Sequence, residues 1–186
     1  VTGGTLSVDR DANLGDASGG LTLNNGTLLT TANFNSTRGI SLNGLGTLEN
    51  SGHNDSLSGT ISGSGGLNLV GVGTTTLSGI NTYTGGTVIN GGTLKVGSDA
   101  NLGEASGGVT LNNGTLLSTA DFSSSRGINL LNGGTLDNGG HSDSFSGVIA
   151  GNGPLTLAGS GTTMLSAAVN TSLKNTSTLQ ANNAIN

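Results

Sequence analysis

An internal duplication that covers most of the sequence is the strongest constraint on the fold of this chain. A shift of 88 residues lays positions 3–78 onto positions 91–166 without a gap, and 51 of the 76 aligned pairs are identical. Self-similarity at a fixed period is typical of repeat architectures, in which each unit packs against its neighbours. We therefore expect one domain over 1–166, made of the duplicated units 3–90 and 91–166. The final stretch, 167–186, departs from the repeat and is interpreted as a degenerate last rung, a cap or a tail.

A shorter period lies inside each unit, where an element ending in Gly-Thr-Leu or a variant of it recurs. The leucines that mark this element in the first unit and at the start of the second are Leu6, Leu28, Leu48, Leu69 and Leu94. Their spacings are 22, 20, 21 and 25 residues, which together fill one unit. Each unit is therefore predicted to hold four sub-repeats that average 22 residues.

The local pattern within a sub-repeat is that of short strands joined by glycine-rich bends. Apolar and polar residues alternate at 21–23, 40–42, 67–69 and 94–96, which is the period of a half-buried strand. Asn-Gly and Gly-Gly pairs supply residues that tolerate positive φ at a tight bend. Glycine is too frequent for long helices, so we expect one short turn at most, at 11–15.

Two arrangements can use such strands, an antiparallel meander and a solenoid. In a solenoid every rung, one full turn of the coil, needs nearly the same perimeter, and the spacing of 20–25 residues favours this arrangement. Stacked rungs place leucine above leucine in a narrow core, and asparagine ladders can hydrogen-bond along the axis. The prediction is an all-β fold, a parallel β-helix of about eight rungs of roughly 22 residues.

Composition and charge exclude several classes of protein. There is no cysteine, so disulfides, thiol chemistry and cysteine-bound zinc are excluded. A net charge of −5 argues against nucleic acid as a partner, because phosphate binding needs clustered Lys and Arg. No apolar run is long enough to span a bilayer and no signal peptide opens the chain, so we expect any export signal to lie outside it.

A longer motif at 73–96 points to a known family. The segment GTTTLSGINTYTGGTVINGGTLKV closely resembles the passenger-associated repeat of Gram-negative autotransporters, the proteins of type V secretion. The resemblance is sharp over 73–96 and diffuse over 1–166. The second unit leaves the pattern after Ser166, where residues 167–172 replace the expected Asn-Thr-Tyr-Thr-Gly-Gly.

This resemblance implies a right-handed coil and a secreted passenger. Such a passenger is exported through the periplasm and the outer membrane by a C-terminal membrane barrel, which lies outside this chain, and ends at the bacterial cell surface. Family members are often adhesins or self-associating proteins, in which these repeats act as scaffold. The expected function is a β-helical stalk for adhesion or self-association, with a host surface ligand or a second copy of the chain as partner. The alternative is a fibre subunit that stacks end to end, and a polysaccharide-active β-helix enzyme is less favoured.

Several polar residues could suggest chemistry, and each has a simpler interpretation. His53 with Asp55, repeated as His141 with Asp143, could form a general base or half a metal site, but glycine-rich surroundings favour a solvated corner. Arg38 and Arg126 are interpreted as surface residues beside Glu49 or Asp137. We therefore predict no catalytic residue and no enzyme activity.

An acidic stretch near the start of the chain also matches no known metal motif. Asp9, Asp11 and Asp16 superficially suggest calcium, but they fit neither the EF-hand loop nor the nonapeptide repeat. The second unit keeps acidic residues only at Asp99 and Glu104. No metal site and no cofactor are predicted.

The rare aromatic residues are the remaining candidates for a binding role. Phe34, Tyr83 and Phe122 are possible contact residues, because aromatic side chains are favoured at the centres of interfaces. Phe34 and Phe122 occupy equivalent positions in the two units. The alternative, which we favour, is that these rings fill gaps in the core.

Overall fold

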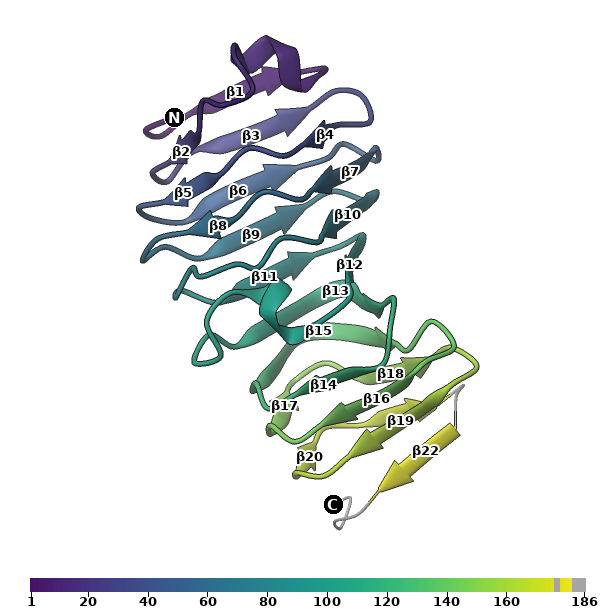
Figure 1. The fold of residues 1–186 in the computed structure, drawn as a ribbon. Helices are drawn as coiled ribbons and strands as arrows, with labels where there is room; N and C mark the ends of the chain where they lie inside the picture. Colours follow the sequence, from purple (N-terminus) through teal and green to yellow (C-terminus); the bar gives the residue numbers. More distant parts are fainter. Residues whose placement is uncertain (176–177, 182–186) are drawn as a thin grey trace.

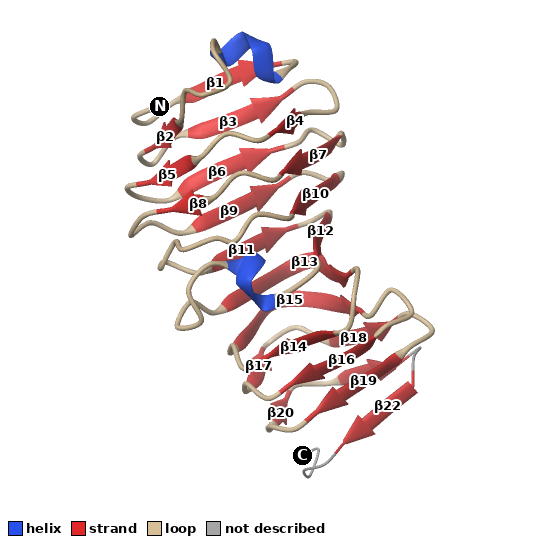
Figure 2. Cartoon of the chain, in the orientation of Figure 1, coloured by secondary structure: helices blue, strands red, loops and turns tan. Residues whose placement is uncertain are grey.

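Short strands wind into a single continuous coil, described in a computed structural model over residues 1–175 and 178–181 (Figure 1). The strand pairings among these residues are parallel, from β1 with β3 to β19 with β22. Two short 3₁₀ helices interrupt the strands, η1 (Asp11–Leu14) and η2 (Asp99–Leu102), both drawn in blue in Figure 2. The predicted all-β solenoid is therefore confirmed, and η1 is the short turn expected at 11–15.

One face of the coil runs the length of the chain and fixes the number of rungs. Its strands are β1 (Thr5–Val8), β3 (Thr27–Thr30), β6 (Gly46–Glu49), β9 (Leu67–Val70), β11 (Thr87–Asn90), the first part of β13 (Val109–Ser118), the first part of β15 (Ile128–Asp137), β17 (Ile149–Gly151) and β20 (Val169–Asn170). Leu28 lies in register with Leu6 on one side and with Leu48 on the other. From the first to the last of these nine stacked strands the chain makes eight full turns, which matches the predicted eight rungs.

A second face begins later and also reaches the C-terminal part. Its strands are β4 (Asn35–Ser36), β7 (Asn54–Leu57), β10 (Thr74–Leu77), β12 (Thr93–Val96), the second parts of β13 and β15, β18 (Leu155–Ala158) and β21 (Leu173–Asn175). Both β13 and β15 therefore bend around a corner and serve two faces. Their pairing shifts register on both sides of Asn112, at this corner.

The third face is built differently in the two units. In the first unit it contains β2 (Leu21–Leu23), β5 (Ile40–Leu42) and β8 (Ile61–Ser62), and in the second β14 (Phe122–Ser124), β16 (Ser142–Phe145), β19 (Thr162–Leu165) and β22 (Thr178–Ala181). Residues 81–84 and the η2 segment fill the space between. The Thr82 N–H donates to the Ile61 carbonyl at 2.8 Å, and the Glu104 N–H donates to the Tyr83 carbonyl at 2.9 Å.

The two units do not stack copy upon copy, which corrects the prediction of four rungs per unit. The column of Leu28 reaches Leu111 after four rungs and 83 residues, through Leu48, Leu69 and Ile89. The copy of Leu28 is Leu116, five residues further on and on the next face. A rung is thus about 21 residues long, and one unit covers four rungs plus one face.

The core follows the alternation of each strand. Inward positions carry leucine, isoleucine and valine. In β9, for example, Leu67 and Leu69 are buried, and the alternate residues Asn68 and Val70 are half-exposed. Fully burying one such side chain stabilises the fold by about 1.5–3 kcal/mol. Because rungs stack in register, these side chains form columns along the axis, and the core needs few aromatic rings to be filled.

An asparagine ladder crosses the outer side of the coil, as predicted. It runs through Asn68, Asn90, Asn112 and Asn132, which come from successive rungs. The Asn112 Nδ2 donates to Asn90 Oδ1 at 2.9 Å, and the Asn132 Nδ2 donates to Asn112 Oδ1 at 2.7 Å. Each amide donates in the same direction, so neighbouring bonds polarise one another and hold the rungs together.

Beyond residue 166 the described strands continue the coil. β20, β21 and β22 pair in parallel with β17, β18 and β19. Residues 176–177 and 182–186 of this final stretch lie outside the described residues. Whether 167–186 forms a last rung, a cap or a tail stays a prediction.

Candidate functional site

Arg38 is a buried residue that holds a loop, and not the surface residue that we expected. Its side chain is 2% exposed, and its Nε donates to Asp11 Oδ1 at 2.8 Å. The other four N–H groups donate to backbone carbonyls of the η1 loop, those of Asp11, Gly15, Asp16 and Gly19. All five donors are thus satisfied, so the guanidinium has no free N–H for a ligand.

Arg126 repeats this arrangement in the second unit. Its side chain is 1% exposed, and its Nε donates to Asp99 Oδ1 at 2.8 Å. The terminal nitrogens donate to the carbonyls of Gly103 at 2.6 Å, of Gly107 at 2.8 Å, and of Asp99 and Glu104. The partners of the two arginines are therefore Asp11 and Asp99, each 27 residues earlier, and not Glu49 or Asp137. We call each arginine with its aspartate and loop carbonyls an arginine clamp.

Residues within each loop fix its shape so that its carbonyl groups can accept hydrogen bonds from the arginine. In the second unit Asn101 Oδ1 accepts the N–H groups of Gly97 and Ser98 at 3.0 and 2.9 Å, which closes the start of η2. Gly103 then takes a φ of +81°, a conformation that favours glycine. The chain turns back so that several carbonyls face inward. Their partial negative charges, together with the Asp99 carboxylate, make a socket for one cation.

The acidic stretch near the start serves three separate contacts. Asp9 pairs with Arg10 at 2.8 Å on the surface, and Asp16 accepts hydrogen bonds from Ser18. Asp11 is partly buried, which opposes its ionisation, but hydrogen bonds from Arg38 and Ser36 outweigh this and lower its pKa. Within residues 1–175 and 178–181, no group of three or more His, Asp or Glu side chains is placed to hold a metal ion.

The two His-Asp pairs do not form solvated corners, because both aspartates are buried. Asp55 on β7 is 6% exposed and Asp143 on β16 is 5% exposed. Asp55 accepts hydrogen bonds from the Thr30 hydroxyl at 2.7 Å and from the Phe34 N–H at 3.2 Å. Burial raises the pKa of Asp55 and of Asp143, and the hydrogen bonds from their hydroxyl partners only partly oppose this. The half-buried histidines lie at the corner just before each strand.

The three aromatic residues considered as contact residues lie in the core. Phe34 and Phe122 are 1% exposed and Tyr83 is 0% exposed, so their rings present no surface to a partner in this fold. Phe122 packs against Phe145 with 5.7 Å between ring centroids. Tyr83 shares a hydrogen bond of 2.6 Å with the Thr87 hydroxyl, and burial raises its pKa to about 12.

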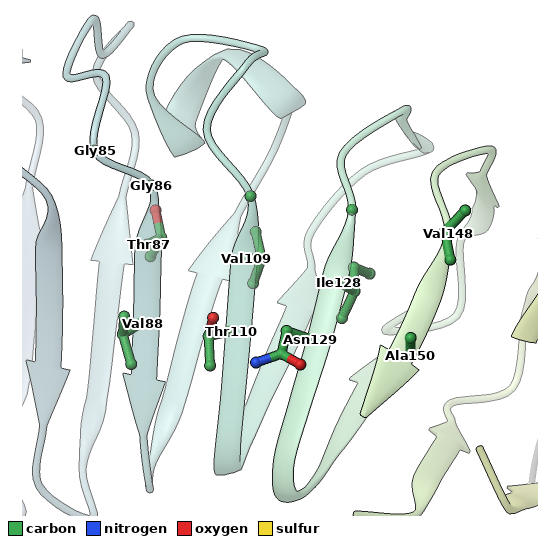
Figure 3. A pocket seen from close by; sticks show the side chains of 12 residues that line it. Gly85, Gly86, Thr87, Val88, Val109, Thr110, Ile128, Asn129, Val148 and Ala150 are labelled. Atoms are coloured by element: carbon green, nitrogen blue, oxygen red, sulfur yellow. The ribbon is translucent and has the colours of Figure 1, made fainter. Parts of the chain in front are cut away.

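A shallow hollow of about 320 Å³ lies on the outer side of β11, β13, β15 and β17 (Figure 3). Val88, Thr110, Asn129 and Ala150 form one row across it, in register from strand to strand. The lining consists of Gly, Ala, Val, Ile, Thr and Asn residues. These side chains offer hydroxyl, amide and apolar contacts but no ionisable group.

The arginine clamps were not predicted from the sequence, although the duplication carried a signal for them. Arg38 and Asp11 recur together as Arg126 and Asp99 with the same separation.

The helices among the described residues are too short and too polar to cross a membrane.

Comparison with known proteins agrees with the resemblance that the sequence shows at 73–96. The family model described as passenger-associated transport repeat matches residues 67–96, which run from the start of β9 to the end of β12. The chain is similar to the adhesin BmaC autotransporter of Brucella suis biovar 1 (strain 1330), with 47% identity over 118 residues. This match covers 63% of the chain but spans only 3% of the length of that protein. No solved structure matches. The predicted passenger repeat is therefore confirmed.

Proposed function

We propose that this chain is a structural segment of an adhesin-like autotransporter passenger, a β-helical stalk that holds other parts of the same polypeptide away from the bacterial surface. The observation that carries the proposal is the parallel pairing that continues through eight rungs. The passenger repeat at 67–96 and the similarity to an adhesin support it. The proposed location is outside the cell, after export through the periplasm and the outer membrane.

The geometry suits a stalk because each rung adds a fixed rise. Adjacent strands in a sheet lie about 4.8 Å apart, so eight rungs extend about 38 Å along the axis. The backbone hydrogen bonds point along this axis and are backed by the columns of buried leucine. Such a rod resists bending, and rung-by-rung stacking lets it fold progressively as the chain emerges from a pore.

The two buried arginines, a residue type that enzymes often use, have structural partners here. Both clamp arginines have every donor bound to the protein, and the hollow in Figure 3 is lined without ionisable groups. General acid-base catalysis needs a titratable group within reach of a bound substrate. A non-enzymatic role is therefore part of the proposal.

Surface display tests the stalk. The chain is fused in front of an autotransporter membrane barrel with an epitope at its N-terminus, and cells are assayed for epitope exposure, protease resistance and binding to immobilised fibronectin, collagen and glycans. We expect an exposed epitope, a protease-resistant chain and no more binding than cells that display the barrel alone. The matched control is Leu111→Asp, which buries a charge in the core and should make the displayed chain protease-sensitive.

Two results would contradict the stalk. Strong binding by cells that display only this chain would make it the adhesive part itself. A displayed chain that is as protease-sensitive as Leu111→Asp would show that the coil does not form on the cell.

Self-association is the second candidate, because a parallel coil presents unpaired backbone groups wherever its stack of strands stops. Light scattering on a concentration series of the purified chain separates the two functions. Rods that lengthen with concentration support a fibre subunit, and monomers at all concentrations exclude it.

A further inference from the structure

Each unit buries one carboxylate that is in none of the ion pairs among the described residues. Asp55 and Asp143 are almost fully buried, whereas the ion pairs among the described residues use Asp9, Asp11 and Asp99. Asp143 Oδ1 is in addition a buried atom without a hydrogen-bond partner among the described residues. Burying an ionised carboxylate is unfavourable unless it is paired, so both positions favour the protonated form.

A hydroxyl group next to each carboxylate has two acceptors but only one proton. Thr30 Oγ1 lies 2.7 Å from Asp55 Oδ2 and 3.3 Å from the Glu49 carbonyl oxygen. Ser118 Oγ lies 2.7 Å from Asp143 Oδ2 and 3.4 Å from the Asp137 carbonyl oxygen. While the aspartate is ionised, the hydroxyl proton goes to the carboxylate and the carbonyl is left with the long, weaker contact.

Protonation of the aspartate reverses this hydrogen bond. The new carboxyl O–H of Asp55 can donate to Thr30 Oγ1, and the hydroxyl proton is then free to donate to the Glu49 carbonyl. Hydronium in the solvent supplies the proton and becomes water, and the carboxyl O–H is the one covalent bond of the chain that forms. One bond between β7 and β3 thereby becomes a relay of two bonds that also reaches the end of β6, the strand that pairs with β3 and precedes β7 in the same rung.

We propose that these groups form two proton-binding clasps, Asp55–Thr30–Glu49 carbonyl and Asp143–Ser118–Asp137 carbonyl, and that the coil becomes more stable when they take up a proton, because a buried charge is removed while the relay keeps the carboxyl and hydroxyl groups hydrogen-bonded. The clasp is a property of this chain beyond a stalk function. It occurs at the equivalent place in both units with a different hydroxyl residue in each. A hydroxyl is therefore the shared requirement, and the methyl group of threonine is not.

The surroundings of each clasp contain few other charges. His53 is the titratable group that interacts with Asp55. His141 and Asp121 are the titratable groups that interact with Asp143. The strands packed against the clasps, β3, β4, β10, β14 and β19, and the paired part of β13 contain no ionisable side chain. Glu49 and Asp137 contribute their carbonyls, and their side chains occupy half-exposed positions.

The sign of the pH dependence follows from the burial. Desolvation, the largest effect, raises the pKa of both aspartates in the folded chain above the ordinary value of 3.8. A group with a raised folded-state pKa stabilises the fold fully below its unfolded pKa, and this contribution is lost as pH rises through the folded pKa. The coil is therefore more stable in mild acid than at neutral pH.

Carbon-13 NMR titration of the aspartate carboxyl groups in the intact chain tests the clasps. We expect Asp55 and Asp143 to titrate above 3.8. Thr30→Val should raise the pKa of Asp55 further, because it removes the hydroxyl that stabilises the carboxylate, and Thr30→Ser should restore it. Asp143 is the internal control, since its clasp lies in the other unit and its pKa should not respond to either change.

Thermal unfolding gives an independent measurement. Each tenfold difference in proton affinity between the folded and unfolded chain corresponds to about 3–5 °C in Tm. Asp55→Asn keeps a side chain that can bond Thr30, and it should remove part of the fall in Tm between pH 4 and pH 7. Asp9→Asn, at a surface carboxylate whose pKa is lowered by Arg10, should not. Carboxyl titration at or below 3.8, or an Asp55 pKa that ignores Thr30→Val, would overturn the proposal.

Discussion

The arginine clamp of the second unit yields a prediction that can be worked through from its contacts. Arg126→Met keeps the length and apolar stem of the side chain but removes all five N–H donors. The change leaves the Asp99 carboxylate and the carbonyls of Gly103, Glu104 and Gly107 without their partner. Removing one member of a buried ion pair costs about 3–5 kcal/mol, because the other charge is left uncompensated.

Two features of the structure limit this cost. The Asp99 side chain is 26% exposed, so water can solvate part of its charge and the lower end of the range, about 3 kcal/mol, is expected. The loop also keeps contacts that do not involve Arg126, among them the buried Leu102 side chain and the hydrogen bond from the Glu104 N–H to the Tyr83 carbonyl, and the rungs on either side stay paired. The loss then shows first as local opening of residues 97–108.

Urea unfolding and limited proteolysis measure the global and the local effect. Arg10→Met is the matched control, because it applies the same substitution to a pair whose arginine side chain is 70% exposed, and an exposed ion pair contributes little to stability. We expect the Arg126 variant to be clearly less stable and to be cut within 97–108. Equal stability of the two variants, with the loop uncut in both, would refute the assignment of Arg126 as a clamp.

Three further experiments test the core, the bends and the buried phenol. Leu111→Ala, at a position that is 0% exposed, should cost about 2–5 kcal/mol in urea unfolding, whereas Leu131→Ala, at a position that is 49% exposed, should cost much less. Gly59→Ala should destabilise strongly, because a Cβ there would lie 2.0 Å from a carbonyl oxygen of the neighbouring rung, and Gly39→Ala, with 3.7 Å to the nearest atom, should be tolerated and serves as its control. The absorbance of Tyr83 at 295 nm should titrate near pH 12, and the stability that comes from its raised pKa should be present below pH 10 and fall as pH rises toward 12.

The repeat predicted the stack well but not which face each strand occupies. Leu28 and Leu48 pair as their spacing indicates, because strands of equal length and alternating pattern stack in register. Leu94 was assigned to the same column, yet it aligns with Thr75 while Ile89 follows Leu69. All three faces use the same kind of short alternating strand, so nothing in the local pattern distinguishes one face from the next.

The polar contacts were harder to predict because they join residues from different rungs. Arg38 and Asp11 are 27 residues apart, and their contact depends on how the η1 loop folds back over the coil. Asp55 was misplaced for a related reason, since a Gly- and Ser-rich neighbourhood is typical of solvent-exposed bends. The inward position of Asp55 follows from its register with Thr75, which only the pairing of β7 with β10 fixes.

The mismatch between the 88-residue duplication and the 21-residue rung bears on how a longer passenger would present its surface. Because one unit covers four rungs plus one of the three faces, each copy in a tandem array would be rotated about the axis by one face relative to the copy before it. Identical loops would then follow a spiral around the rod, and every third copy would present its loop on the same side. A flat partner would meet one copy in three, while partners arriving from every side would find an equivalent loop.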